Sequence, residues 1–407
     1  MLKAYKFRLY PTVEQIILLE KHFGACRFIY NHFLVLSKKE KALKKSDMQK
    51  AIVSLKSDEN FLWLNEINSQ SLQVASHHLH EAYQRFFKHL GGYPSFKTRR
   101  HMHQSFSVPQ NVELSDNKIY IPKFKKEGIK VIVHRALPVN ALIKQATISR
   151  HSGKYFISML IEDHQEIASL CAPQNSIGID MGLSCYMATS EHKKLDNPKW
   201  FMCSQKRLKT LQRVLKKKKK NSKNRIKAKQ KVSALHTKVS NQRKDFQHKL
   251  SHAITKHYDV IGVESLHVKG MVKNRHLSKA ISDASWGEFI RQLEYKALWG
   301  GKHLVKIDKW FPSSKTCSCC GSTKKSLKLS QRTYVCDECN TKLDRDINAS
   351  INIKNEALRI LDMAGIAMTV KSAPISILAQ ASEIAKGVNN NGLHESVEAP
   401  TISALAV

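Results

Sequence analysis

Acidic residues are scarce in this sequence. Its 407 residues include 33 Asp or Glu against 68 Lys or Arg, a formal net charge of +35. So many like charges repel one another in a compact molecule, and a bound polyanion relieves that repulsion. The sequence also lacks a secretory signal and any run approaching the ~20 apolar residues that span a bilayer. These absences exclude an exported or membrane-spanning protein and predict a cytoplasmic protein that binds nucleic acid.

Cysteine is uncommon too, but four of the nine cysteines form two close pairs, Cys317-x2-Cys320 and Cys336-x2-Cys339. A reducing compartment disfavours disulfides, and this spacing brings four thiolates around one tetrahedral Zn²⁺, as in a zinc ribbon. Cys319 lies inside the first pair, but the two-residue spacing favours Cys317 and Cys320 as the ligands. A site closed by four thiolates has no open position, so one structural zinc is predicted. The isolated cysteines at 26, 171, 185 and 203 are expected to be buried fillers.

Hydrophobic periodicity divides the first 170 residues into two kinds of segment. Residues 3–9 alternate as a strand, and Thr12-x-x-Gln15 is typical of a capping box that opens a helix. Helical patterns continue to about 90, where GGYP ends them. From about 105 to 163 the period is two, which predicts a small antiparallel barrel or sheet. Strand 3–9 could join that sheet, so that the helical block would be an insertion into it.

The remainder of the chain alternates strands with helices, which predicts an α/β domain. Buried strands are expected at 177–180, 258–265 and 303–308, with a hairpin return after the first and a helix over 285–299. The tail from about 365 is polar and poorly patterned, so we expect it to be frayed.

The most basic segment runs from Lys206 to Lys244, with 17 Lys or Arg and no acidic residue. Leucines and valines at helical spacing predict two basic helices, broken near Asn221. Their lysines could simply face water. The absence of acids that would form i,i+4 pairs favours a phosphate backbone instead. The candidate nucleic-acid-binding residues are Lys216, Lys217, Lys218, Lys219, Lys220 and Arg225.

Three acids stand out in a chain with few of them. Asp180 and Glu264 each follow a buried strand, and Asp346 lies at the start of an expected helix. An acid at such a position is costly unless it meets a cation or strong donors. Three converging carboxylates would hold two Mg²⁺ ions about 4 Å apart for phosphodiester hydrolysis. Taken singly, each could be structural, because Asp344 or Asp346 could cap a helix and Glu264 could cap the segment after its strand.

Longer motifs resemble the TnpB family, the OrfB transposases of bacterial insertion sequences, which are compact relatives of type V CRISPR effectors. The similarity extends from about residue 3 to about 360. It is carried by IGIDMG at 177–182, IGVESL at 261–266, SDASWGEFIRQLEYKA at 282–297, FPSSKTCSCCG at 311–321 and CDECNTKLDRDINASINI at 336–353. Ser350, where alanine is common, and Cys319 are the departures.

The resemblance implies an α/β RNase H-like (RuvC-like) nuclease domain with a zinc-ribbon insert, plus an N-terminal β-barrel that carries a helical insertion. Asp180, Glu264 and Asp346 become its catalytic, Mg²⁺-binding residues, with Asp346 chosen over Asp344 by the family pattern. The implied organisation is a wedge-type barrel at 1–10 and 96–170, a helical recognition insertion at 11–95, a nuclease domain at 171–310 and 343–365 with a basic hairpin at 204–250, a zinc ribbon at 311–342 and a flexible tail at 366–407.

The resemblance also implies a function: RNA-guided cleavage of double-stranded DNA beside a short flanking motif, with a guide RNA derived from the transposon. Its setting would be a bacterial or archaeal cytoplasm, at the nucleoid. Two alternatives remain at this point. One is a transposase that joins DNA ends by transesterification, and the other is a regulator that binds nucleic acid without cutting it.

Overall fold

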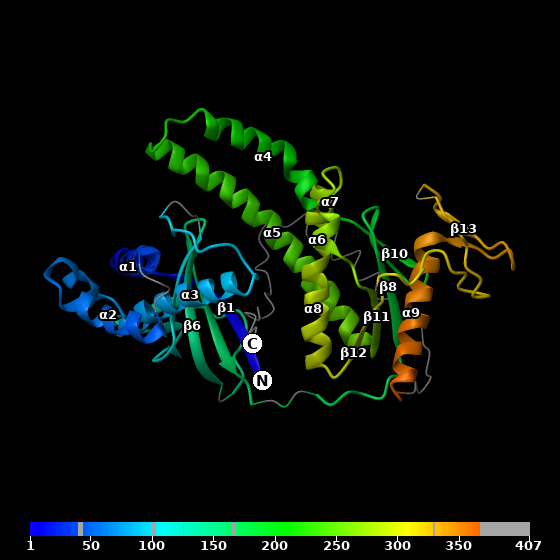
Figure 1. The fold of residues 1–407 in the computed structure, drawn as a ribbon, viewed down its shortest axis with the longest axis horizontal. Coiled ribbons are helices and arrows are strands. Elements are labelled where there is room, and N and C mark those ends of the chain that lie inside the picture. The colour runs from blue at the N-terminus through cyan, green and yellow to red at the C-terminus, as the bar shows by residue number, and fades with distance from the viewer. Residues whose placement is uncertain are drawn as a thin grey trace. The chain divides into compact units, whose positions relative to one another are not determined.

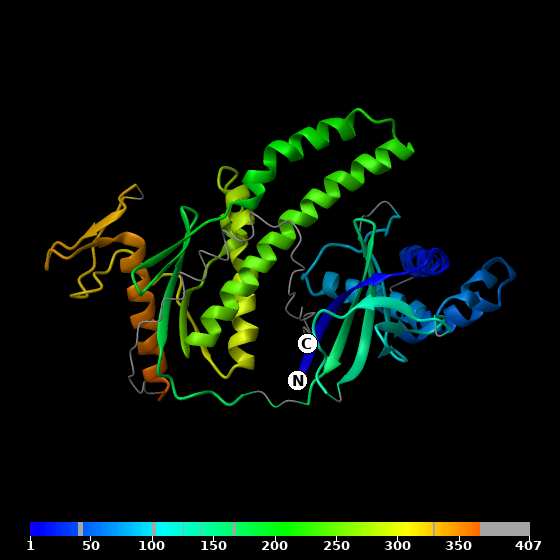
Figure 2. The same ribbon diagram turned by 180° about the vertical axis from the view of Figure 1, so that it is seen from behind.

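The computed structural model describes residues 1–39, 44–99, 103–124, 126–139, 141–164, 166, 168–328 and 330–366. These residues form two compact units (Figures 1 and 2). The first comprises Met1–Gln165 with Lys223–Ala234, and the second comprises Glu166–Ser222 with the described residues from Leu235 onward. The predicted flexible tail lies outside the described residues, apart from residue 366.

The first unit combines a seven-stranded antiparallel sheet with helices. Its strands are β1 (Leu2–Tyr10), β2 (His103–Val108), β3 (Glu113–Ser115), β4 (Lys118–Tyr120), β5 (Ile129–Ile132), β6 (Leu142–His151) and β7 (Lys154–Glu162). They lie in the order β2-β6-β7-β1-β5-β4-β3, so the N-terminal strand is central to the sheet, between β7 and β5. Among the described residues β2 and β3 are the two edges, and closure into a barrel stays a prediction.

Between β1 and β2 the chain forms α1 (Val13–Lys39), α2 (Lys45–Ser57), the 3-10 helix η1 (Glu59–Glu66) and α3 (Ser69–Phe87). The predicted capping box opens α1: the Thr12 amide donates to Gln15 Oε1 at 3.1 Å and the Gln15 amide to Thr12 Oγ1 at 3.3 Å. Apolar residues of these helices and of the sheet share one core, to which Phe7, Phe33 and Ile157 belong. The helical block is therefore an insertion between two strands of the sheet in sequence, and it shares one hydrophobic core with that sheet.

The second unit is built on a five-stranded mixed sheet, in the order β10-β9-β8-β11-β12. Its strands are β8 (Ser176–Met181), β9 (Cys185–Thr189), β10 (Lys193–Asp196), β11 (Val260–Glu264) and β12 (His303–Ile307). Strands β8, β11 and β12 are parallel, and β9 returns antiparallel beside β8 as predicted. A parallel core with an antiparallel hairpin at one edge is the expected α/β arrangement.

The helices of this unit are α4 (Trp200–Lys216), α6 (Val268–Met271), α7 (Ser278–Ala284), α8 (Trp286–Trp299), α9 (Arg345–Met363) and the part of α5 (Lys223–His257) from Leu235 onward. The basic segment forms α4 and α5, with the predicted break at 217–222. Helix α9 covers one face of the sheet, while α8 and the second half of α5 cover the other (Figures 1 and 2). A two-stranded sheet of β13 (Thr333–Val335) and β14 (Lys342–Asp344) leads into α9.

Helix α9 lies unusually close to strands β8 and β11. A Cβ atom added to Gly178 would lie 2.0 Å from the Ser350 carbonyl oxygen, and one added to Gly262 would lie 2.9 Å from Ala357 Cβ. Only glycine permits an approach this close, because its backbone carries no side chain. The glycines of IGID and IGVE therefore fix the distance between the helix and the sheet.

Candidate active site and metal centre

Two of the predicted acids lie side by side because of strand register. Val263 of β11 pairs with Ile179 of β8 in a parallel ladder, so the next residues, Glu264 and Asp180, are level at the carboxyl ends of adjacent strands. Side chains alternate along a strand, and the residues two positions earlier are Gly262 and Gly178. Asp180 and Glu264 therefore point to the face of the sheet that α9 covers.

The third acid, Asp346, lies in the first turn of α9. Asp344 is the N-cap of this helix, and its carboxylate accepts hydrogen bonds from the amides of Asp346 at 2.9 Å and Ile347 at 3.2 Å. The sequence left the capping role open between Asp344 and Asp346, and the structure assigns it to Asp344. The carboxylate of Asp346 is consequently free of capping.

The three acids interact electrostatically. Burial, followed by the charges of Glu264 and Asp346, raises the pKa of Asp180 to about 7, although Arg345 and Lys194 act in the opposite direction. Among the described residues none donates a hydrogen bond to the Asp180 carboxylate. A half-buried carboxylate beside two others, without a donor, is an environment that favours a bound cation. The ligand chemistry therefore fits Mg²⁺, which prefers carboxylate oxygens.

Protein partners occupy the other two carboxylates. Lys194 of β10 donates to Asp346 Oδ2 at 2.9 Å and lies 2.7 Å from Asp344 Oδ1. Burial would lower the pKa of Lys194, but its bonds to Asp344 and Asp346 outweigh that effect and raise it. Ser313, which is buried, donates from its hydroxyl to Glu264 Oε1. Each contact limits the rotation of the carboxylate that it holds.

The three acids and the second candidate centre, a group of four cysteines, differ in how closely their possible ligand atoms approach one another. In the described part of the chain, one group of His, Cys, Asp or Glu brings its ligand atoms within 4.8 Å of one another, and it consists of Cys317, Cys320, Cys336 and Cys339. The three carboxylates do not form such a group. They are neighbours whose oxygens lie farther apart than those of a closed metal site.

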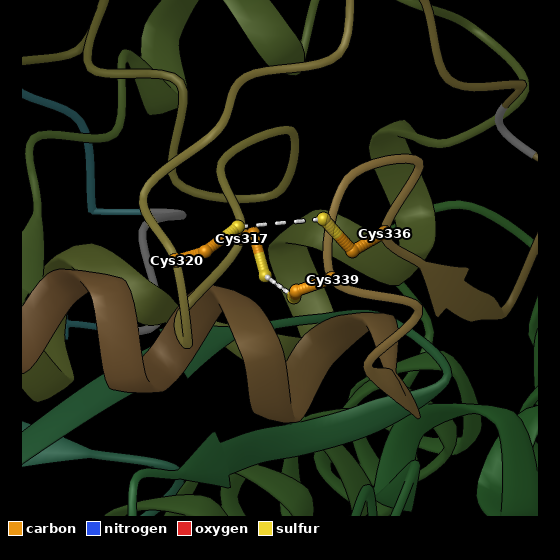
Figure 3. A group of neighbouring side chains, drawn as sticks. All are labelled: Cys317, Cys320, Cys336 and Cys339. Carbon is orange, nitrogen blue, oxygen red and sulfur yellow. Dashed lines mark hydrogen bonds between the residues drawn. The ribbon is translucent and has the colours of Figure 1, made fainter.

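The four cysteines converge from two loops, and their sulfur atoms point toward one another (Figure 3). Cys317 Sγ is 3.7 Å from Cys339 Sγ, and Cys320 Sγ is 3.5 Å from Cys336 Sγ. Four sulfurs at about 2.3 Å from one zinc ion would be separated by nearly this distance. Cys319 is exposed and outside the group, as the spacing predicted. The set of four fits a tetrahedral thiolate site.

The cysteine centre is tied to the first turns of α9 by two buried asparagines. Asn348 donates to the Thr316 carbonyl at 2.7 Å and accepts from the Ser318 amide at 3.0 Å. Asn352 donates to the Ser313 carbonyl at 2.8 Å and to that of Thr316 at 2.6 Å. The helix that carries Asp346 is thus held by the loop that carries Cys317.

The predicted nucleic-acid-binding residues lie at the break between α4 and α5. Lys216 to Lys220 are all exposed, and Arg225, in the first turn of α5, is half-buried. The apolar stripes predicted in these helices are present, since Leu208, Leu235 and Val239 are buried. Contact with nucleic acid at these side chains stays a prediction.

Sequence reasoning missed several residues of the site. Lys194 gave no signal, because a lysine in a basic chain is unremarkable. Asn348 and Asn352 could have been found, since polar residues four apart on the apolar face of a helix need partners.

The isolated cysteines differ in their burial. The expectation of a buried side chain holds for Cys26 and Cys185, whereas Cys171 is only half-buried. It is wrong for Cys203, which is exposed on the first turn of α4. Cys185 also has a neighbour in the candidate site, because its sulfur lies 3.8 Å from Asp346 Oδ2.

Comparison with known proteins matches three family profiles to the chain. They are described as "Helix-turn-helix domain" (OrfB of IS605) at residues 1–45, "Probable transposase" (OrfB of IS605) at 158–275 and "Cas12f1-like, TNB domain" at 286–353. Within the described residues, no helix has the length and apolar character needed to cross a membrane.

Relatives match over most of their length. A protein of Streptomyces pristinaespiralis named "Putative RNA-guided DNA endonuclease" is 35% identical over 357 residues, covering 86% of this chain and 88% of the relative. One of Escherichia coli K12 with the same designation, InsQ, is 31% identical over 375 residues, covering 86% and 91%. The fold is similar to that of a Cas12f1 protein solved with sgRNA and target DNA, with a TM-score of 0.52, 13% identity, and 87% of this chain and 99% of that one covered.

Proposed function

Because this chain belongs to the TnpB (OrfB) family of transposable elements, we propose that it is an RNA-guided DNA endonuclease. The observation that carries the proposal is the register of β8 and β11, which sets Asp180 level with Glu264 beneath the first turn of α9. Three acids gathered at one point are costly unless a cation or strong donors compensate them, and a metal-dependent nuclease uses such a cation. The family relationship and the local chemistry point to the same activity.

The second unit is then the RuvC-like nuclease domain, and Asp180, Glu264 and Asp346 are its catalytic residues. The high pKa of Asp180 and the absence of a described donor to it favour a cation there. We infer that these three carboxylates hold Mg²⁺, which when bound supplies the positive charge that activates a water and stabilises the leaving oxygen. Lys194 keeps Asp346 oriented, and Ser313 keeps Glu264 oriented. Cleavage would leave a 5′-phosphate and a 3′-hydroxyl.

The four cysteines are proposed to bind one structural zinc. Their sulfur separations suit that ion, and a closed set of four thiolates offers no position for substrate. Through Asn348 and Asn352 the centre supports the helix that presents Asp346. Zinc would thus act on cleavage indirectly, by holding α9 in place.

The partners follow from the charge and from the family. We propose that a guide RNA transcribed from the transposon end binds the basic surfaces, including Lys216 to Lys220, and that the bound RNA pairs with one strand of double-stranded DNA. The sheet of the first unit and its inserted helices would hold the RNA and read the short flanking motif. Their proposed roles are those of a wedge-type barrel and a recognition insertion.

The direct test is cleavage of a plasmid library, in which a guide-matched target is followed by a randomised flanking motif. Wild type loaded with its RNA should linearise a subset of plasmids, and Asp180→Ala should cut at least about a thousand-fold more slowly, since a carboxylate of the reacting centre is lost. Asp196→Ala removes an exposed carboxylate from β10 of the same sheet, and its cleavage should equal that of wild type.

Three results would contradict the proposal. Equal cleavage rates of wild type and Asp180→Ala would show that the assignment of the catalytic carboxylates is wrong. Recovery of joined DNA ends in place of free ends would indicate transesterification by a transposase. Stable, guide-dependent binding of the target by wild type, with no cutting across all flanking motifs, would indicate a non-cleaving regulator.

A further inference from the structure

A large aromatic side chain is exposed close to the candidate active site. Trp310 retains 80% of its accessible surface, whereas Trp200 and Trp286 are buried. Exposing an indole costs free energy, because its apolar surface stays in contact with water. Sequence reasoning did not single out this residue, and the site as described above does not use it.

The backbone around Trp310 is fixed by contacts on both sides, so the loop conformation itself places the ring in solvent. The Trp310 amide donates to Asp308 Oδ1 at 2.7 Å, immediately after β12 ends. The next residue, Phe311, packs into the apolar core between β12 and α9. Two residues later, Ser313 bonds Glu264. The loop is anchored on both sides, and Trp310 is the residue it presents to solvent.

A pocket of about 520 Å³ lies between Glu264 and this loop. Its lining includes Glu264 itself, Leu266 and Ile290 as apolar walls, and Arg291, Lys306 and Lys309 as cations. Lys309 belongs both to the pocket and to the loop, because its Nζ lies 4.8 Å from the centre of the Trp310 ring. The indole therefore contacts a side chain of the pocket that Glu264 also lines.

Two of the three cations around the pocket form ion pairs with described acidic residues, and the third does not. Arg291 is paired with Glu288 at 2.7 Å, and Lys306 is paired with Glu294. Lys309 forms no ion pair with any residue that the structure describes. An exposed aromatic ring, an apolar wall and an uncompensated ammonium group together suit a nucleotide with an unpaired base, which stacks through its ring and is neutralised at its phosphate. A protein partner would need an acidic patch at the same place.

We propose that Trp310 and Lys309 form a platform for the DNA strand that is being cut: the indole stacks on an unpaired base next to the scissile phosphate, and Lys309 pairs with the phosphate of that nucleotide. The inference rests on the proposed nuclease function and adds a substrate subsite to it. Trp310 acts as a positioning residue, because it holds the strand and does not touch the reacting atoms. The strand must be single-stranded where it passes Glu264, since a base inside a duplex has both faces covered.

The test compares three substitutions of Trp310 in the full chain loaded with its RNA. Trp310→Leu keeps an apolar side chain but cannot stack, and the single-turnover cleavage rate should fall roughly ten-fold, within the range of one base–aromatic contact. Trp310→Phe should retain most of the rate, and Trp310→Ala should resemble Trp310→Leu. Affinity for the whole target should stay unchanged, because many other contacts hold it. Leu298→Ala, another exposed apolar residue near the C-terminal end of α8, should cut as wild type does.

Fluorescence of 2-aminopurine in the DNA identifies the base that stacks on Trp310. In the non-cutting Asp180→Ala background, 2-aminopurine is substituted at successive positions of each strand around the cut site. One position should show fluorescence that Trp310→Phe retains and Trp310→Leu changes. Zinc content and the melting temperature of Trp310→Leu should equal those of wild type.

Several outcomes would overturn the inference while leaving the nuclease assignment intact. These are a Trp310→Leu variant that cuts at the wild-type rate, a 2-aminopurine signal that no Trp310 variant alters, or loss of zinc in Trp310→Leu, which would give the side chain a folding role. A change of oligomeric state on Trp310→Leu, with unaltered 2-aminopurine signals, would assign the ring to a protein interface. If wild type binds no guide-matched duplex at all, the proposed function itself fails.

Discussion

At the scale of single residues, Lys296 of α8 is unusual because its ammonium group points into the protein. Its Nζ donates to the His248 carbonyl at 2.6 Å and to Ser251 Oγ at 2.7 Å. Burial lowers the pKa of Lys296 to about 7 and that of His248, which also faces Lys296, to about 4. The contacts between α8 and α5 thus include a lysine that holds its proton weakly near neutral pH.

This lysine gives the stability of the second unit a defined pH dependence. In the unfolded chain a lysine titrates near 10.4, so between about pH 7 and pH 10 the unfolded state binds more protons than the folded state. The free energy of unfolding contributed by Lys296 must therefore rise with pH across that window. We expect the difference between wild type and Lys296→Met, measured by urea denaturation, to grow in favour of wild type from pH 7 to pH 9. A difference independent of pH would show that the ammonium group is solvated in the folded protein.

Single residues of the candidate site could be predicted where their position is energetically unfavourable without a partner, as for an acid at the end of a buried strand. Asp180 and Glu264 end buried strands, which made them conspicuous without a structure. The choice between Asp344 and Asp346 needed the family pattern, because both lie where a helix begins, and the structure then placed the cap at Asp344. Lys194 could not be predicted, since its role depends on β10 lying beside the start of α9. Contacts between distant segments leave no periodic signal in a sequence.

At the scale of elements, the packing of α9 on the sheet depends on Gly178. We expect Gly178→Ala to destabilise the protein by about 3 kcal/mol or more, because the new Cβ would meet backbone of α9 that a side-chain rotation cannot relieve. Cleavage should fall as well, since any shift of α9 moves Asp346. Urea denaturation and the cleavage rate measure the two effects.

A matched control exists within the same unit. At Gly287, in the first turn of α8, an added Cβ would meet nothing within 4 Å apart from its chain neighbours and the backbone of its own helix. Gly287→Ala should therefore leave stability unchanged or raise it by up to about 1 kcal/mol, the gain in helix propensity. Equal stability of Gly178→Ala and wild type would mean that α9 lies farther from β8 than the structure places it.

Elements were predictable to the extent that their signals are local. The capping box at Thr12, the break between α4 and α5, and a strand within 258–265 follow from short patterns, and each is present. Strands β2 and β6 were covered only by a general expectation of period two, because their exposed and buried positions alternate imperfectly. The order of strands depends on pairings between residues more than 100 positions apart, as between β1 and β7, and periodicity does not encode them.

At the scale of the whole molecule, the net charge of +35 sets how the protein meets its partner. Each phosphate neutralised by a lysine releases counterions, so affinity for nucleic acid falls with salt in proportion to the number of contacts. The five lysines from Lys216 to Lys220 are exposed in a segment without acids. They should therefore contribute to the salt dependence more than lysines scattered over a surface that also carries acids.

Replacing Lys216 to Lys220 with glutamine should weaken RNA binding and reduce the slope of log K against log salt by up to about 0.7 to 0.9 for each phosphate contact that is lost. The control carries five other exposed lysines of the second unit changed to glutamine, Lys269, Lys273, Lys279, Lys325 and Lys328, which lowers net charge equally. If net charge alone mattered, both variants would lose the same slope. A larger loss for the first variant, in RNA titrations at several salt concentrations, would locate phosphate contacts at the break between α4 and α5. Equal losses would instead mean that the lysine run is a solvated surface, and that the excess charge attracts RNA without a preferred site in this segment.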